Sequence, residues 1–191
     1  MKGLSKGNFF FFDKDYAELE IKPDSLCHAY LAILTDELDT ANIIFSHIDS
    51  PRGKWGKVLV SILKGYMSDF PTYFSIRNFL EIDIDFLLKN DKIDYVEQCL
   101  GALEFLSTIN QETFKFAARV MLENRFFTSA LKYLERSKQI YYNDPELHFM
   151  LAKYYLNANN IKEASFYTEE CLRLIPDYYP AQLIKQRLAF L

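Results

Sequence analysis

The sequence has 191 residues and a formal net charge of -4, and half of its residues are hydrophobic, including 17 Phe and 13 Tyr. A chain of this size can bury a substantial core without disulfides, and six Gly and six Pro are too few for a sandwich or barrel of many short strands. Three unpaired cysteines (Cys27, Cys99, Cys171) argue against a disulfide framework or a multi-cysteine zinc site. We therefore expect an all-α protein without a signal peptide or membrane span, located in the cytoplasm.

The N-terminal segment, residues 1–22, contains four consecutive phenylalanines, Phe9 to Phe12. An apolar run of this kind is costly to expose to water. We expect a segment that is either flexible or packed on the first hairpin or on another molecule. That hairpin is predicted over residues 24–50, with helices at 24–34 and 38–49.

A further helix is predicted near residues 54–67, and a long helix follows from about Thr72 to Lys89. The first of these contains a Gly-x-x-Gly motif, Gly53 to Gly56, within a basic stretch, residues 52–64. Similar loops clamp the nucleic-acid backbone in KH domains, but the sheet of that fold is not expected here. We favour a repeat-like helix with an inward stripe of Trp55, Val58, Leu59 and Ile62.

Acidic residues are dense between residues 81 and 104, where Glu81, Asp83 and Asp85 alternate. Their spacing does not fit a calcium loop, so a solvated acidic helix face is the favoured interpretation. The three histidines (His28, His47, His148) lack the spacing of metal ligands, and His28 and His148, the latter at an aromatic position of the C-terminal repeat, are expected at core or boundary positions. No metal site, cofactor or catalytic constellation is predicted.

The C-terminal half repeats itself. When Gln111–Asp144 is aligned with Pro145–Tyr178, at an offset of 34 residues, Ala118 falls on Ala152 and Ala130 on Ala164. Small residues at these places allow two antiparallel helices to approach closely. Asp144 before Pro145 predicts a helix start, and Pro176 predicts a helix end.

This pattern resembles the tetratricopeptide repeat. The last unit matches it with Leu151, Ala152, Tyr155, Ala164, Cys171 and Pro176, and the preceding unit with Phe114, Ala117, Ala118, Met121, Ala130, Leu134 and Ser137. The resemblance is clear over residues 111–178, degenerate over 77–110 and loose over 24–50. It implies one domain over residues 23–191, an α-solenoid of antiparallel helix hairpins forming a TPR-like superhelix, with a capping helix at 180–191.

In tetratricopeptide arrays the first helix of each hairpin lines a concave groove. Carried over residue by residue, this resemblance implies an apolar floor of Phe116, Phe149 and Met150, with Lys115, Arg119 and Lys153 anchoring ligand carboxylates. A solvated face is the alternative. Polar positions of the same face are Glu112, Glu123, Glu146 and Asn157.

The resemblance implies a non-catalytic protein- or peptide-binding scaffold, in particular a small cytoplasmic chaperone or adaptor, whose ligand carries apolar and acidic residues. Homodimerisation stays open. The alternative is an RNA-associated helical protein that uses the basic stretches 52–64 and 115–138, although the net negative charge weighs against a nucleic-acid partner. An enzyme ranks third.

Overall fold

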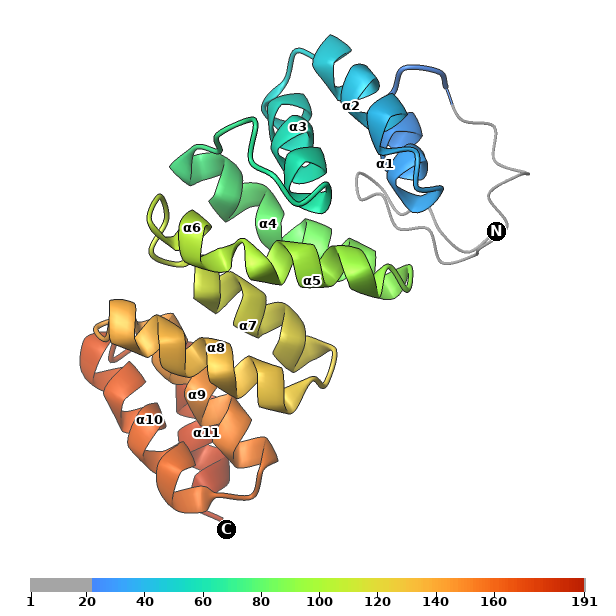
Figure 1. Cartoon of the computed structure of the whole chain (residues 1–191). Helices are drawn as coiled ribbons and strands as arrows, with labels where there is room; N and C mark the ends of the chain where they lie inside the picture. The colour runs from blue at the N-terminus through green and yellow to red at the C-terminus, as the bar shows by residue number, and fades with distance from the viewer. Residues whose placement is uncertain (1–21, 191) are drawn as a thin grey trace. The chain divides into compact units, whose positions relative to one another are not determined.

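The computed structural model describes residues 22–190, and over that range the chain forms eleven helices and no strand (Figure 1). The all-α class expected from the composition is confirmed. The chain divides into two compact units, one ending at Asn110 and the other beginning at Gln111. The expectations for Phe9 to Phe12 concern residues outside the described range, and the prediction of one array over residues 23–191 stays a prediction.

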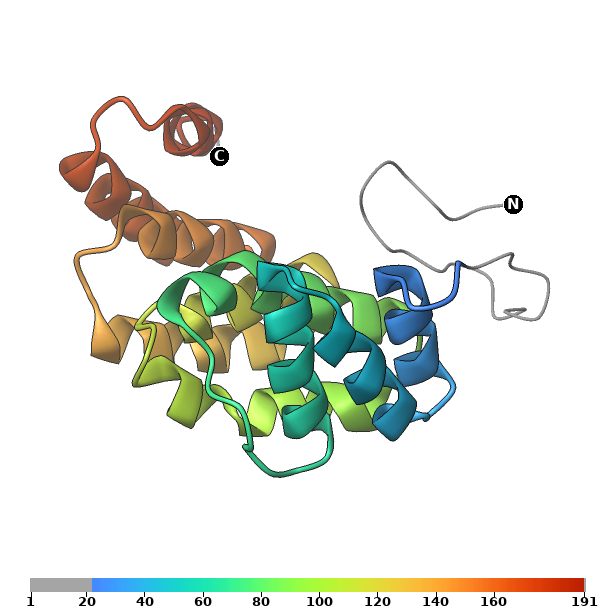
Figure 2. The same ribbon diagram turned by 90° about the horizontal axis from the view of Figure 1, so that it is seen from above.

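The first unit contains the helices α1 (Leu26–Leu34), α2 (Leu38–His47), α3 (Pro51–Leu63), α4 (Tyr73–Lys89), α5 (Ile93–Gly101) and α6 (Leu103–Ser107). Figure 2 shows α1, α2 and α3 side by side, and each packs against the next. Helix α3 also packs against α4 and α5. The two helices predicted for the first hairpin and the long helix after Thr72 are confirmed.

Helix α3 begins and ends earlier than the helix predicted near residues 54–67. The Ser50 hydroxyl accepts a hydrogen bond from the Gly53 backbone N–H at 3.0 Å, and Pro51 occupies the first turn. Both features favour a helix start at this position. The helix ends at Leu63, shortly before Gly65, whose φ of 77° suits a residue without a Cβ atom.

The glycines of the Gly-x-x-Gly motif allow α2 and α3 to pack closely. A Cβ atom on Gly53 would lie 2.1 Å from the backbone oxygen of Ile48, and one on Gly56 would lie 2.2 Å from the Phe45 ring. Both glycines therefore have a packing role within this unit. The predicted inward stripe is confirmed, because four side chains are buried: Trp55, Val58, Leu59 and Ile62.

The second unit contains the helices α7 (Thr113–Glu123), α8 (Phe127–Ile140), α9 (Pro145–Asn157), α10 (Ile161–Leu174) and α11 (Tyr179–Leu188). Helix α7 packs against α8, α9 packs against α10, and α11 lies against α10 and α9. The Asp144 carboxylate accepts hydrogen bonds from the backbone N–H groups of Glu146 and Leu147, which confirms the predicted start of α9. The predicted end before Pro176 is also confirmed, since α10 stops at Leu174.

The four alanines that align between the two repeats are fully buried: Ala118, Ala130, Ala152 and Ala164. They lie on α7, α8, α9 and α10 respectively. This burial is what close approach between paired helices requires, because a larger side chain would hold the helices apart.

We predict that Ala164→Phe destabilises the second unit, because a phenyl ring has no room at a fully buried alanine. Overpacking of this kind costs about 1–3 kcal/mol in the free energy of unfolding. Urea denaturation followed by circular dichroism measures the loss. Lys162→Ala on the same helix is the matched control and should change little, because Lys162 is exposed; equal losses would contradict the described packing.

His148 lies in the core of the second unit, as expected from its position in the repeat. Its ring is fully buried and contacts the rings of Tyr142 and Tyr167, with centroid separations of 4.8 and 5.9 Å. Burial lowers the pKa of His148, and this effect outweighs the opposing attraction of Glu170. The folded protein therefore holds this imidazole in its neutral form more strongly than the unfolded chain does.

This burial predicts a loss of stability in mild acid. Below the ordinary histidine pKa of about 6.5, the unfolded chain binds a proton at this histidine more readily than the folded chain does. The free energy of unfolding therefore decreases as the pH is lowered. The urea midpoint should decrease between about pH 7.5 and pH 5.5. His148→Phe should flatten this decrease, whereas His47→Phe, at an exposed position, should leave it unchanged.

Candidate functional site

The first unit is organised around a fully buried carboxylate, that of Asp83 on α4. Its Oδ1 atom accepts hydrogen bonds from the Tyr30 hydroxyl at 3.0 Å and from the Arg52 guanidinium at 2.5 Å. Its Oδ2 atom accepts a hydrogen bond from the Trp55 indole Nε1 at 2.5 Å. These four residues, the Asp83 cluster, join α1, α3 and α4 through one side chain.

The prediction that Asp83 belongs to a solvated acidic face is wrong. Its neighbours Glu81 and Asp85 are partly exposed, but Asp83 points into the unit. A helix of 3.6 residues per turn places Asp83 nearly opposite Glu81 and Asp85, which share a face. What the period could not reveal is that donors 31 and 53 residues away, Arg52 and Tyr30, meet Asp83 in the core.

Charge and aromatic contacts offset the burial of the Asp83 cluster. Burial raises the pKa of Asp83, and the positive charge of Arg52 and the hydrogen bonds oppose that rise. The guanidinium carbon of Arg52 lies 5.0 Å from the Tyr30 ring centroid and 4.7 Å from that of Phe79. Cation–π contacts of this kind compensate in part for the water that the guanidinium loses.

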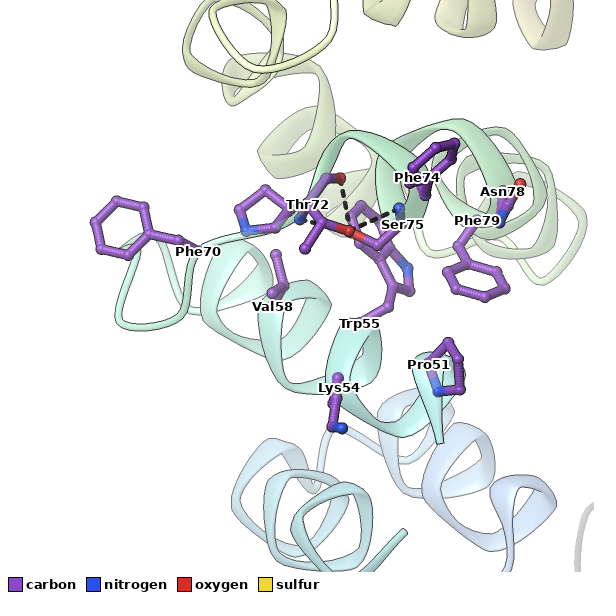
Figure 3. A pocket seen from close by; sticks show the side chains of 11 residues that line it. Pro51, Lys54, Trp55, Val58, Phe70, Thr72, Phe74, Ser75, Asn78 and Phe79 are labelled. Atoms are coloured by element: carbon purple, nitrogen blue, oxygen red, sulfur yellow. Dashed lines mark hydrogen bonds between the residues drawn. The ribbon is translucent and has the colours of Figure 1, made fainter. Parts of the chain in front are cut away.

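A pocket of about 320 Å³ lies between α3 and α4 (Figure 3), and it shares Trp55 with the Asp83 cluster. The described residues that line this α3–α4 pocket are Pro51, Lys54, Trp55, Val58, Phe70, Pro71, Thr72, Phe74, Ser75, Asn78 and Phe79. Trp55 belongs to both sites, because its N–H is bound to Asp83 while its side chain forms part of the wall. The buried carboxylate therefore fixes the orientation of a pocket residue.

The rim of the α3–α4 pocket is aromatic and exposed. Phe70 is 72% exposed and Phe74 is 70% exposed. The turn between them is held by a capping box in which Thr72 and Ser75 exchange hydrogen bonds of 2.9 and 3.1 Å (Figure 3). Of the described lining residues, Lys54 alone is charged.

Two of the three cations predicted to anchor a ligand, Lys115 and Arg119 on α7, have partners within the second unit. Lys115 is 2% exposed, and its Nζ atom lies 2.5 Å from Asp144, 2.9 Å from Glu112 and 3.1 Å from Glu146. Burial acts to lower the pKa of Lys115, but the hydrogen bond and charge of Asp144 outweigh it, so the pKa is raised. Arg119 also pairs with Glu146.

The apolar floor expected on the same face is only partly accessible. Phe116 and Met150 are buried, which corrects the expectation that they face a groove. Phe149 is half-buried, and its ring centroid lies 5.5 Å from that of Tyr178. The remaining predicted site residues are exposed: Glu123, Lys153 and Asn157. Helices α7 and α9 do pack together, but the buried members of the set act in packing.

Several cations of the two basic stretches are paired with carboxylates of the same unit. Over residues 52–64, Arg52 contacts Asp83, Lys57 contacts Asp69 at 3.1 Å and Lys64 contacts Asp39 at 2.5 Å. Over residues 115–138, Lys115 and Arg119 are paired as described, and Lys138 lies 2.5 Å from Glu135. The basic stretches therefore present less free positive charge than their composition indicates.

A second pocket, of about 410 Å³, lies beside α10 and α11 in the second unit and is lined by charged side chains. One of them, Lys185, lies 2.9 Å from Glu169. Arg173, which also lines it, contacts Glu170 at 3.0 Å. The two cations of this pocket are therefore paired with carboxylates of the same unit. No aromatic side chain lines this pocket among the described residues.

Other chemistry is sparse between residues 22 and 190. No group of three His, Cys, Asp or Glu side chains in this range is placed to hold a metal ion. The three cysteines are free thiols. None of the helices described has both the length and the apolar character that a membrane span needs.

Comparison of the chain with family models, with curated proteins and with solved structures found no match.

We predict that Asp83→Ala strongly destabilises the first unit. Removing this carboxylate leaves the buried Arg52 guanidinium without its partner, and breaking a buried pair on one side costs about 3–5 kcal/mol. Urea denaturation followed by circular dichroism gives the change. Asp39→Ala is the matched control, since the Asp39 carboxylate is exposed and pairs with Lys64 at the surface; a similar shift for both variants would contradict the central role of Asp83.

Proposed function

We propose that this chain is a non-catalytic protein-binding scaffold and that the α3–α4 pocket receives an aromatic side chain from a partner peptide. The helices supply a rigid frame, and the exposed ring of Phe74 and its neighbour Phe70 supply the contact surface. A small chaperone or adaptor works in this way, by holding a segment of another protein without changing it chemically.

The exposure of Phe70 and Phe74 is the observation that carries this proposal. Single exposed apolar residues are ordinary, but two phenylalanines that are each at least 70% exposed border the same apolar pocket. The pocket volume of about 320 Å³ is at the lower end of the range for ligand sites. Aromatic side chains that fill such pockets dominate many protein interfaces.

The charge at the rim favours an acidic flank on the ligand. Lys54 is 77% exposed and lies 3.2 Å from Asp49, which is itself 94% exposed. A surface pair of this kind contributes little and exchanges readily with another carboxylate. We therefore expect a peptide in which aromatic residues are flanked by Asp or Glu.

We also infer that α7–α10 are two tetratricopeptide-like hairpins and that the helices form an α-solenoid. The buried alanines, the Asp144 cap and the packing of α11 on α9 and α10 support this arrangement. The accessible part of the α7–α9 face offers a second surface for a protein partner through Glu123, Phe149, Lys153 and Asn157. Several cations of the two basic stretches already pair with carboxylates of the same unit. We therefore favour a protein over RNA as the binding partner.

A fluorescein-labelled peptide, Gly-Ser-Phe-Phe-Asp-Asp-Gly-Ser, tests the proposed pocket, with fluorescence anisotropy as the measurement. We predict that Phe74→Ser raises the Kd of this probe at least about tenfold, which corresponds to about 1.4 kcal/mol. The fold should be retained, because Phe74 is mostly exposed. Lys54→Glu should weaken binding as well, since it replaces attraction by repulsion.

Two matched variants in the second unit serve as controls. Phe166→Ser removes another exposed aromatic ring, and Lys162→Glu reverses another exposed charge. Both should leave the Kd unchanged. The proposal would be contradicted if a peptide with serines in place of the two phenylalanines bound as tightly as the probe. It would also be contradicted if Phe166→Ser raised the Kd as much as Phe74→Ser does.

A further inference from the structure

We propose that the α3–α4 pocket receives Phe70 from a second copy of this chain, and that the second copy receives Phe70 of the first in the same way. The product is a homodimer with two-fold symmetry, in which the surface around each pocket is covered. This inference rests on the proposed function of the pocket, because it assigns that site a ligand that competes with partner peptides.

The surface around the pocket carries both halves of such a contact. A two-fold interface brings the same patch of each copy together, so the patch must contain a projecting group and also a cavity that accepts it. The Phe70 ring is 72% exposed and borders the α3–α4 pocket. Figure 3 shows this ring pointing away from Trp55 and Val58, so it does not fill the pocket that it borders. The ring is therefore available to the pocket of another copy.

The charge beside Phe70 matches the rim of the pocket. Asp69 precedes Phe70 in the chain, which gives the aromatic residue with an acidic flank that the pocket favours. Phe70 in the pocket of a second copy would bring this carboxylate close to Lys54, the one charged residue among the described lining residues. Within a single chain, Asp69 contacts Lys57 at 3.1 Å and Lys54 contacts Asp49 at 3.2 Å. Pairs of this kind at the surface contribute little, so their members can change partners at small cost.

The exposed aromatic area suits a weak dimer. The ring centroids of Phe70 and Phe105 lie 6.0 Å apart, and those of Tyr73 and Phe74 lie 5.5 Å apart. These four rings are between 36% and 72% exposed. Because an aromatic side chain buries roughly 150–250 Å², the four together offer roughly 300–500 Å² in each copy. Two copies would bury about 600–1,000 Å², which lies in the range of weak, transient interfaces. We therefore expect a dimer that dissociates readily and leaves monomers for a partner peptide.

Analytical ultracentrifugation of the full chain tests the dimer. The unchanged chain should shift from monomer to dimer as its concentration rises from the micromolar to the millimolar range. Phe70→Ser should raise the dimer Kd at least about tenfold and leave the circular dichroism spectrum unchanged, because Phe70 is mostly exposed. Phe166→Ser, which removes an exposed ring of the second unit, is the matched control and should leave the Kd unchanged. A chain that stays monomeric, or a dimer that Phe70→Ser does not weaken, would overturn the proposal.

A charge exchange between two chains tests the reciprocal geometry. Lys54→Asp alone and Asp69→Lys alone should each weaken the dimer, because each places like charges together at both pockets. A mixture of the two variants should form a tighter dimer than either variant alone, because opposite charges then meet at both pockets. Energy transfer between differently labelled chains measures this gain. A mixture of Asp69→Lys with Lys162→Asp, at an exposed lysine of the second unit, should show no such gain. Absence of the gain in the first mixture would overturn the proposed contact.

The unlabelled probe peptide separates this inference from the proposed function. An excess of the peptide should convert the dimer into monomers, because both ligands need the same pocket. If the chain is monomeric at every concentration while the probe binds and Phe74→Ser weakens that binding, the proposed function stands and the dimer does not. If the dimer forms through Phe70 but the probe neither binds nor dissociates it, the dimer stands and the proposed function is lost.

Discussion

The carboxylate of Asp83 imposes the constraint on which the first unit depends. A charge in the core is costly, so the three donors from Tyr30, Arg52 and Trp55 must converge on it with good geometry. That requirement fixes α1 and α3 against α4. It also fixes the indole of Trp55, which forms part of the pocket wall. The structural core and the candidate binding site are thus connected by one side chain.

A buried cation has a corresponding role in the second unit. Lys115 is surrounded by carboxylates from Glu112, Asp144 and Glu146, and Asp144 also caps α9. This arrangement relates the register of α7 to the first turn of α9. The consequence for function is direct, since a lysine that holds its own helices together is poorly placed to hold the carboxylate of a ligand.

The α3–α4 pocket differs from these internal clusters because its rim faces solvent, where the Phe70 ring lies 6.0 Å from that of Phe105 and the Phe74 ring 5.5 Å from that of Tyr73. The phenylalanines at its edge are mostly exposed, while its wall is held by the Asp83 cluster and by the close contact of α3 with α2 at Gly53 and Gly56. A rigid wall with an exposed apolar rim loses little entropy when a ligand binds. These properties are the basis for the proposal that the pocket binds an aromatic side chain.

The sequence by itself determined the features that depend on neighbouring residues. The all-α class follows from composition, the starts of α4 and α9 from Thr72 and from Asp144-Pro145, and the buried alanines from the 34-residue alignment. The tertiary structure alone decided which charges are buried and which apolar residues are exposed. Asp83 and Lys115 looked like surface residues because Arg52, Tyr30 and Asp144, which pair with them, are distant in the chain. Phe116 and Met150 were expected in a groove floor because the repeat resemblance assigns them to a helix face but does not show what covers that face. Burial depends on several helices at once, and so the α3–α4 pocket could not be identified before these helices were placed together.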